Sequence, residues 1–148
     1  MVETPLLDKF KAIKLIDSSG WNISPGLKKI FPGSGGSASP AGCKVQLVYE
    51  YKTGAMHSVE ITKGTLPDQK YSQEIPGIVN ENDLIIFDLG YWVSEIFMKI
   101  KEKGAYFISR LNTRLNLLIK EGNDKFSELN LENFLKNQNV ASIEFSAF

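Results

Sequence analysis

Cysteine and histidine are nearly absent from this sequence, whose 148 residues include one of each, Cys43 and His57. A lone cysteine cannot form an internal disulfide, and such scarcity is typical of proteins that work in a reducing compartment. The usual zinc sites need several Cys or His ligands and are therefore not expected. A catalytic Cys–His pair would have to use these two residues, but neither lies in a recognisable motif.

Long apolar runs are missing as well. No stretch approaches the roughly 20 apolar residues that a membrane-spanning helix needs. The N-terminus lacks the basic-then-apolar pattern of a signal peptide. We therefore expect a protein of the cytoplasm that does not enter the membrane.

The formal net charge is zero, so overall charge gives no indication of nucleic-acid binding. The distribution is uneven, however, because residues 89–120 contain six basic residues against two acidic ones. This basic segment either attracts an anionic partner or forms an ordinary solvated surface.

The most informative pattern lies in residues 83–110. Residues 84–87 form a short unbroken apolar run, which is typical of a strand buried on both faces. Asp88 ends the run, apolar residues then recur at helical spacing over 92–100, and residues 105–111 predict another strand. In open α/β sheets, functional groups gather where strands lead into helices. Asp88 is therefore a candidate functional residue.

Upstream, residues 12–19 predict a strand that carries a second aspartate, Asp17. The alternation over residues 43–51 and 55–62, around the turn at 52–54, predicts a β-hairpin. The glycine-rich residues 31–42 lack the Lys and Ser/Thr of a phosphate-binding loop and predict a surface loop. Asp68 is expected to cap a short helix that ends at residues 76–77.

Beyond residue 111 the pattern weakens. Residues 115–119 fit either a strand or a helix, Asn130 is placed to cap a helix over 131–135, and residues 141–148 alternate like a strand.

The two aspartates predict chemistry if their strands are parallel neighbours, because their carboxylates would then converge. Facing carboxylates repel unless a cation lies between them, and Asp oxygens suit Mg²⁺ or Mn²⁺. Such a pair serves metal-assisted phosphodiester chemistry. The alternative is that Asp17 and Asp88 merely end their strands.

Four stretches, taken together and in order, resemble the DDE transposases of bacterial insertion sequences, most closely insertion-sequence family four. They are IDSS at 16–19, AGCKVQLVYEYKTG at 41–54, LPD at 66–68, and FDLGYW…GAYFISRL over 87–111. The resemblance implies an α/β, ribonuclease H-like fold: a mixed β-sheet of three antiparallel then parallel strands, flanked by helices. The first catalytic Asp would lie on the first strand and the second just after the fourth.

By this resemblance, Asp17 and Asp88 are the catalytic residues and the ligands of Mg²⁺ or Mn²⁺. Arg110 matches an arginine of the family near the active-site edge, where it would contact phosphate. Lys103 and Arg114 are further candidate DNA contacts.

The third acid of the family, a Glu within a Tyr–Arg–Glu–Lys signature, has no counterpart here, since Glu121, Glu128, Glu132 and Glu144 all lack that context. We therefore expect residues 1–148 to be a partial catalytic core. Residues 10–111 would supply its strands and helices, and residues 112–148 would begin an insertion or C-terminal extension. An N-terminal DNA-end-binding domain is not expected.

The expected function of the intact enzyme is DNA transposition and recombination: cutting at transposon ends and joining the strands to target DNA. Its partners would be transposon-end and target DNA, with a homodimer on paired ends. The 148 residues alone would be inactive. A ribonuclease H-like nuclease or resolvase, a non-catalytic remnant that binds DNA or a partner, and an unrelated small α/β domain remain alternatives.

Overall fold

A computed structural model describes residues 5–35, 39–110, 117–121 and 125–129. The chain divides into two compact units, Met1–Leu111 and Asn112–Phe148. No helix within the described ranges is long and apolar enough to cross a bilayer.

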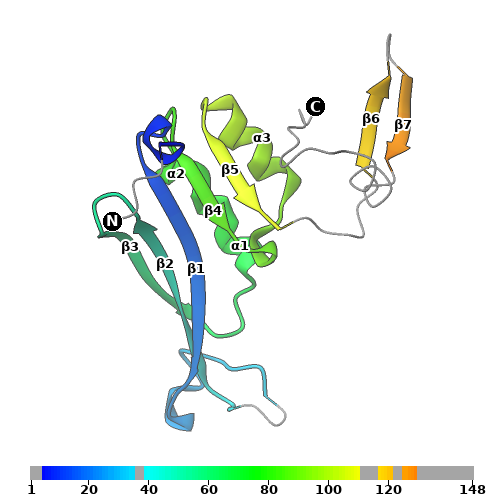
Figure 1. The fold of residues 1–148 in the computed structure, drawn as a ribbon. Helices are drawn as coiled ribbons and strands as arrows, with labels where there is room; N and C mark the ends of the chain where they lie inside the picture. The colour runs from blue at the N-terminus through cyan, green and yellow to red at the C-terminus, as the bar shows by residue number, and fades with distance from the viewer. Residues whose placement is uncertain (1–4, 36–38, 111–116, 122–124, 130–148) are drawn as a thin grey trace. The chain divides into compact units, whose positions relative to one another are not determined.

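The first unit is built on a five-stranded sheet with the order β3-β2-β1-β4-β5 (Figure 1). Its strands are β1 (Ile13–Asn22), β2 (Gly42–Glu50), β3 (Ala55–Lys63), β4 (Leu84–Phe87) and β5 (Tyr106–Ser109). Strands β1, β2 and β3 are antiparallel, whereas β4 and β5 run parallel to β1. The predicted mixed sheet of three antiparallel then parallel strands is confirmed, with Asp17 on β1 and Asp88 directly after β4.

The helical segments of this unit are short. They are η1 (Leu7–Lys9), η2 (Pro25–Leu27), α1 (Asp68–Tyr71), η3 (Ser72–Glu74), α2 (Ile75–Ile78), η4 (Leu89–Tyr91) and α3 (Ser94–Glu102), where η marks a 3-10 turn. The predicted helix from residue 68 thus forms as consecutive short pieces, and it continues through Pro76 and Gly77. Pro76 is accepted because it stands in the first turn of α2, where its missing N–H costs no hydrogen bond.

The core lies between one face of the sheet and these helices. Ile16, Val48, Ile85 and Phe87 point from four positions on β1, β2 and β4 toward helical side chains such as Ile96. Successive residues of a strand alternate between faces, so every second residue of each strand belongs to the other face. That face stays open at its edges, and its apolar side chains are more than half exposed at Val59 (54%), Ile61 (62%), Tyr106 (54%) and Ile108 (55%).

The predicted hairpin is confirmed as β2 and β3. Cys43 pairs with Lys63 at one end of this hairpin, while His57 lies near the other end, close to the bulge at Val48/Tyr49. Six strand residues separate them, about 20 Å at the usual rise per residue. This separation excludes a catalytic pair formed by Cys43 and His57.

The second unit contains a two-stranded antiparallel hairpin, β6 (Leu117–Glu121) with β7 (Lys125–Leu129). The ambiguous residues 115–119 thus contribute to a strand from Leu117 onward. The helix expected over 131–135, the strand expected over 141–148 and Arg114 lie outside the described residues.

Candidate functional site

The two predicted catalytic aspartates come together where β4 ends beside the middle of β1. These strands are parallel neighbours, and their register pairs Ile16 with Phe87. Asp17 is the next residue on β1 and Asp88 directly follows the last residue of β4, so their backbones lie roughly one strand spacing apart, about 4.8 Å. Because Ile16 and Phe87 face the core, both aspartates follow the alternation to the other face, where both are exposed.

Asp88 is held in place by two groups. Its Oδ1 accepts hydrogen bonds from the backbone N–H of Leu89 at 2.5 Å and from Nε of Arg110 at 2.7 Å. Nη2 of Arg110 is 2.5 Å from the same oxygen. The Leu89 N–H first, and the Arg110 guanidinium second, lower the pKa of the Asp88 carboxyl below its usual value. Asp88 therefore stays ionised at neutral pH and keeps Oδ2 for another partner.

Asp17 differs from Asp88 in its surroundings. Across residues 5–110, no hydrogen bond or ion pair engages its carboxylate. The Asp17 carboxylate therefore stabilises no contact of the described residues, and its oxygens are free to bind a cation.

A polar network lies directly behind this pair and is centred on Asp68, the first residue of α1. Its Oδ1 accepts hydrogen bonds from Ser18 Oγ (3.0 Å), Lys44 Nζ (2.9 Å) and Gln46 Nε2 (3.1 Å). Burial raises the pKa of Asp68, but these three donors outweigh it and lower the pKa overall. Asp68 was expected to cap α1, which is wrong: Pro67 holds the cap position, and no side-chain cap bond forms.

The network continues to the turn that follows Asp88. Tyr91 in η4 donates its hydroxyl hydrogen to Gln46 Oε1 at 2.6 Å, and both side chains are fully buried. Burial raises the pKa of Tyr91, so its hydroxyl remains a donor at all ordinary pH values. At Gly90, a Cβ would approach Asp68 Oδ2 to 3.1 Å, so a side chain at this position would crowd the carboxylate. The network thereby joins the strand of Asp17 to the turn of Asp88.

The donor set of this edge fits Mg²⁺ or Mn²⁺ rather than zinc or calcium. Mg²⁺ is usually bound through one or two carboxylates while it keeps several waters or phosphate oxygens. Asp17 and Oδ2 of Asp88 supply that number. No cluster of three or more His, Cys, Asp or Glu side chains suited to a metal occurs in the part of the chain that the structure describes.

The other predicted DNA contacts are distributed unevenly. Arg110 lies at this edge, where β5 ends beside β4. Lys103 lies at the other end of the strands, between the end of α3 and the start of β5. It donates hydrogen bonds to the carbonyls of Pro76 and Val79.

Sequence reasoning missed the Asp68 network. Its members come from four separate segments, and each looks like an ordinary polar residue of a strand, turn or helix start. The one available signal was Ser18, a hydroxyl side chain that follows Asp17 and shares the face of the strand to which the apolar Ile16 belongs.

Comparisons with known proteins agree on the family. A family model described as "Transposase DDE domain" matches residues 8–145. The transposase for insertion sequence element IS231F of Bacillus thuringiensis subsp. israelensis is 32% identical over 125 residues, covering 84% of this chain and 26% of that protein. The transposase for IS1151 of Clostridium perfringens is 34% identical over 119 residues, covering 80% of this chain and 25% of that protein.

Among solved structures, a cryo-EM structure of a piggyBac transposase synaptic complex with hairpin DNA gives a TM-score of 0.45 at 13% identity, covering 88% of this chain and 26% of that one. The chain spans about a quarter of the length of the curated relatives it matches. Since the family model covers nearly all of it, the chain belongs to the DDE transposases of bacterial insertion sequences.

Proposed function

We propose that the edge formed by Asp17 and Asp88 is the metal-binding part of a DNA transposase active site. The observation that carries this proposal is the parallel register of Ile16 with Phe87, which makes the two aspartates neighbours although they are far apart in the sequence. A divalent ion bound there would stabilise the negative charge that develops on phosphate oxygens during cleavage and strand transfer.

The surrounding residues have distinct tasks in this proposal. Asp17 and Asp88 hold Mg²⁺ or Mn²⁺, and the Asp68 network keeps β1 and the turn after β4 at a constant separation. Arg110 neutralises Asp88 in the structure described here and contacts a DNA phosphate when a cation takes over that carboxylate. Asp68 is a positioning residue, because it acts through Ser18 and Gln46.

The intact protein would cut DNA at transposon ends and join the strands to target DNA, as a dimer on paired ends in the cytoplasm. We propose that the 148 residues alone do not catalyse this reaction, because two carboxylates hold a cation weakly and the third acid of the family has no match in this sequence. DNA strand cleavage by the purified chain in Mg²⁺, abolished by Asp17→Asn, would contradict this part.

The metal site is tested by titrating the full chain with Mn²⁺ and following free Mn²⁺ by electron paramagnetic resonance. Asp17→Asn and Asp88→Asn should each weaken Mn²⁺ binding by about tenfold or more, since each removes one of two anionic ligands. Asp8→Asn, which neutralises an exposed aspartate on η1, is the matched control and should bind like the parent.

Arg110→Gln gives the opposite result if the assignment is right. It removes a cation that competes for Asp88, so Mn²⁺ should bind more tightly than to the parent while affinity for DNA falls. If neither aspartate variant changes Mn²⁺ affinity relative to Asp8→Asn, the proposed site is refuted.

A further inference from the structure

The sheet extends well beyond the catalytic edge at the far end of β1. After Asp17, β1 continues to Asn22 and stays paired with β2 throughout. Trp21 pairs with Cys43 of β2, and Cys43 pairs with Lys63 of β3, so the three residues form one row across the sheet. In Figure 1 this end of the hairpin, together with η2, projects away from the helices.

This projecting end is basic although the whole chain is neutral. The sequence contains no Asp or Glu between Asp17 and Glu50. Its exposed large side chains are Trp21 (52%), Leu27 (42%) and Ile30 (61%). We call the tip surface the exposed residues of this end: Trp21, Leu27, Lys28, Lys29, Ile30 and Lys63.

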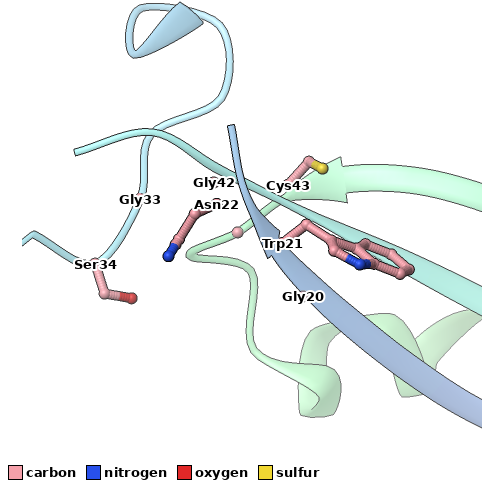
Figure 2. A pocket seen from close by; sticks show the side chains of 8 residues that line it. Gly20, Trp21, Asn22, Gly33, Ser34, Gly42 and Cys43 are labelled. Atoms are coloured by element: carbon pink, nitrogen blue, oxygen red, sulfur yellow. The ribbon is translucent and has the colours of Figure 1, made fainter. Parts of the chain in front are cut away.

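A hollow of about 110 Å³ opens within the tip, between the end of β1 and residues 33–34. Figure 2 shows the side chains of Asn22 and Ser34 beside it, with glycines forming much of the rest of the wall. These glycines let backbones approach closely: at Gly64, a Cβ would lie 2.8 Å from backbone atoms of Gly42. The wall therefore presents backbone groups and four uncharged side chains, those of Trp21, Asn22, Ser34 and Cys43, with no acid among them.

The tip surface combines exposed lysines with an exposed tryptophan and includes no carboxylate. It is therefore complementary to a nucleic-acid backbone. The alternative is that these residues form an ordinary solvated loop without a ligand. An ordinary solvated loop does not need large apolar side chains exposed beside its lysines. An acidic protein partner would fit the charge equally, yet the proposed function brings DNA to the adjacent edge.

We propose that the tip surface binds the DNA duplex next to the phosphodiester that lies at Asp17 and Asp88. The inference rests on the proposed function for the identity of the ligand. Lys28, Lys29 and Lys63 contact phosphates, and Trp21 packs against the sugar or an unstacked base.

The geometry gives the spacing of these contacts. Asp17 and Trp21 belong to the same face of β1, four residues apart, which is about 14 Å at the rise of an antiparallel strand. Successive phosphates of one DNA strand advance by about 3.4 Å along the duplex axis. The tip surface therefore reaches phosphates about four nucleotides from the bond at the catalytic edge.

The test measures affinity of the full chain for a fluorescently labelled duplex of about 20 base pairs, in EDTA, over a range of salt concentrations. Each lost phosphate contact reduces the slope of log K against log salt by about 0.9. Lys28→Gln with Lys29→Gln should therefore reduce the slope by about 1.8, and affinity at 0.1 M salt should fall by about 60-fold.

The matched control is Lys9→Gln with Lys11→Gln, which removes the same charge from exposed positions at the other end of β1. It should cost less than about threefold. Lys28→Arg with Lys29→Arg should bind like the parent, because the charge is kept. Equal losses in the glutamine pair and the control, or no measurable binding by the parent at low salt, would overturn the inference.

Trp21 provides a local readout. Trp92→Phe leaves Trp21 as the sole tryptophan and is a mild change, because Trp92 Nε1 is buried without a hydrogen-bond partner. Duplex DNA should quench or shift Trp21 emission with the same salt dependence as the binding curve. Binding without any change in Trp21 emission would place the DNA elsewhere.

The two proposals fail separately. Because the DNA measurement contains no divalent ion, Asp17→Asn with Asp88→Asn should leave tip binding at the parental level or raise it. Loss of Mn²⁺ binding without loss of tip binding would refute only the metal site. Normal Mn²⁺ binding with a tip variant equal to its control would refute only the tip surface.

Discussion

The buried ion pair between Lys14 and Asp83 permits a sharp test of how the sheet is held together. Lys14 is on β1, and its Nζ lies 2.7 Å from Asp83 Oδ2 and donates a hydrogen bond to the Ile78 carbonyl at 2.6 Å. Both side chains are 3% exposed. Asp83 immediately precedes β4 and also accepts a hydrogen bond from the Asn80 N–H. The pair therefore fixes β1 against β4, in the register on which the aspartate pair depends.

Asp83→Asn keeps the size and the hydrogen-bonding shape of the side chain but removes its charge. The Lys14 ammonium is then buried with a carbonyl as its remaining partner, and breaking a buried pair in this way costs about 3–5 kcal/mol. Lys14→Met should cost a similar amount, because it leaves the Asp83 carboxylate buried without its cation. Lys14→Met with Asp83→Asn should cost less than the sum of the two by about 2 kcal/mol or more, since no uncompensated charge remains.

Urea unfolding of the full chain, followed by far-ultraviolet circular dichroism, measures these changes. With a slope of about 2 kcal/mol per M, the Asp83→Asn midpoint should fall by about 2 M. The control is Glu95→Gln, which breaks the exposed i,i+4 pair with Lys99 on α3 and should leave the urea midpoint nearly unchanged, because solvent screens an exposed pair. If Asp83→Asn is as mild as Glu95→Gln, or if the single costs add in the double variant, the reasoning is refuted.

Three further predictions concern other contacts of the sheet; the first two are measured by the same urea unfolding and the third by acid unfolding. Tyr91→Phe leaves the buried Gln46 Oε1 without its donor and should cost about 1–2 kcal/mol, whereas an unchanged midpoint would mean that the carbonyl finds another donor. Gly64→Ala places a methyl group against the Gly42 backbone and should cost about 1–3 kcal/mol; a neutral result would contradict the close approach of β2 and β3. Burial raises the pKa of Glu50, but hydrogen bonds from Thr53 and from three backbone N–H groups outweigh it and lower the pKa to about 2. Glu50 should therefore stabilise the fold fully above its ordinary pKa near 4.5 and lose this effect as the pH falls toward 2, so Glu50→Gln should flatten the acid-unfolding curve over that interval.

The elements that sequence could predict are those written in a local pattern. Residues 84–87 are apolar without interruption and stop at Asp88, which describes a buried strand and its end. The hairpin of β2 and β3 follows from alternation around a glycine turn. The pairing of Asp17 with Asp88 needed the additional assumption that their strands are parallel neighbours, and the resemblance to a known family supplied it.

What sequence could not predict depends on partners that are distant along the chain. Nothing near Lys14 in the sequence indicates that it is buried, because the carboxylate that neutralises it, Asp83, lies 69 positions further along the chain. Asp68 looked like a helix cap because Pro67 and Asp68 resemble a helix start. The sequence did not show that Lys103 and Arg110 lie at opposite ends of β5, because a net basic segment does not reveal where each of its charges lies on the sheet.

The open face of the sheet has a practical consequence for anyone who handles this protein. Val59 and Ile61 on β3, and Tyr106 and Ile108 on β5, are solvent-exposed apolar side chains at both edges of the sheet, where a lipophilic reporter molecule can bind. Environment-sensitive dyes such as anilinonaphthalene sulfonate fluoresce on exposed apolar surface. Such dyes will therefore fluoresce strongly with the native chain. Thermal unfolding is better followed by circular dichroism than by dye fluorescence.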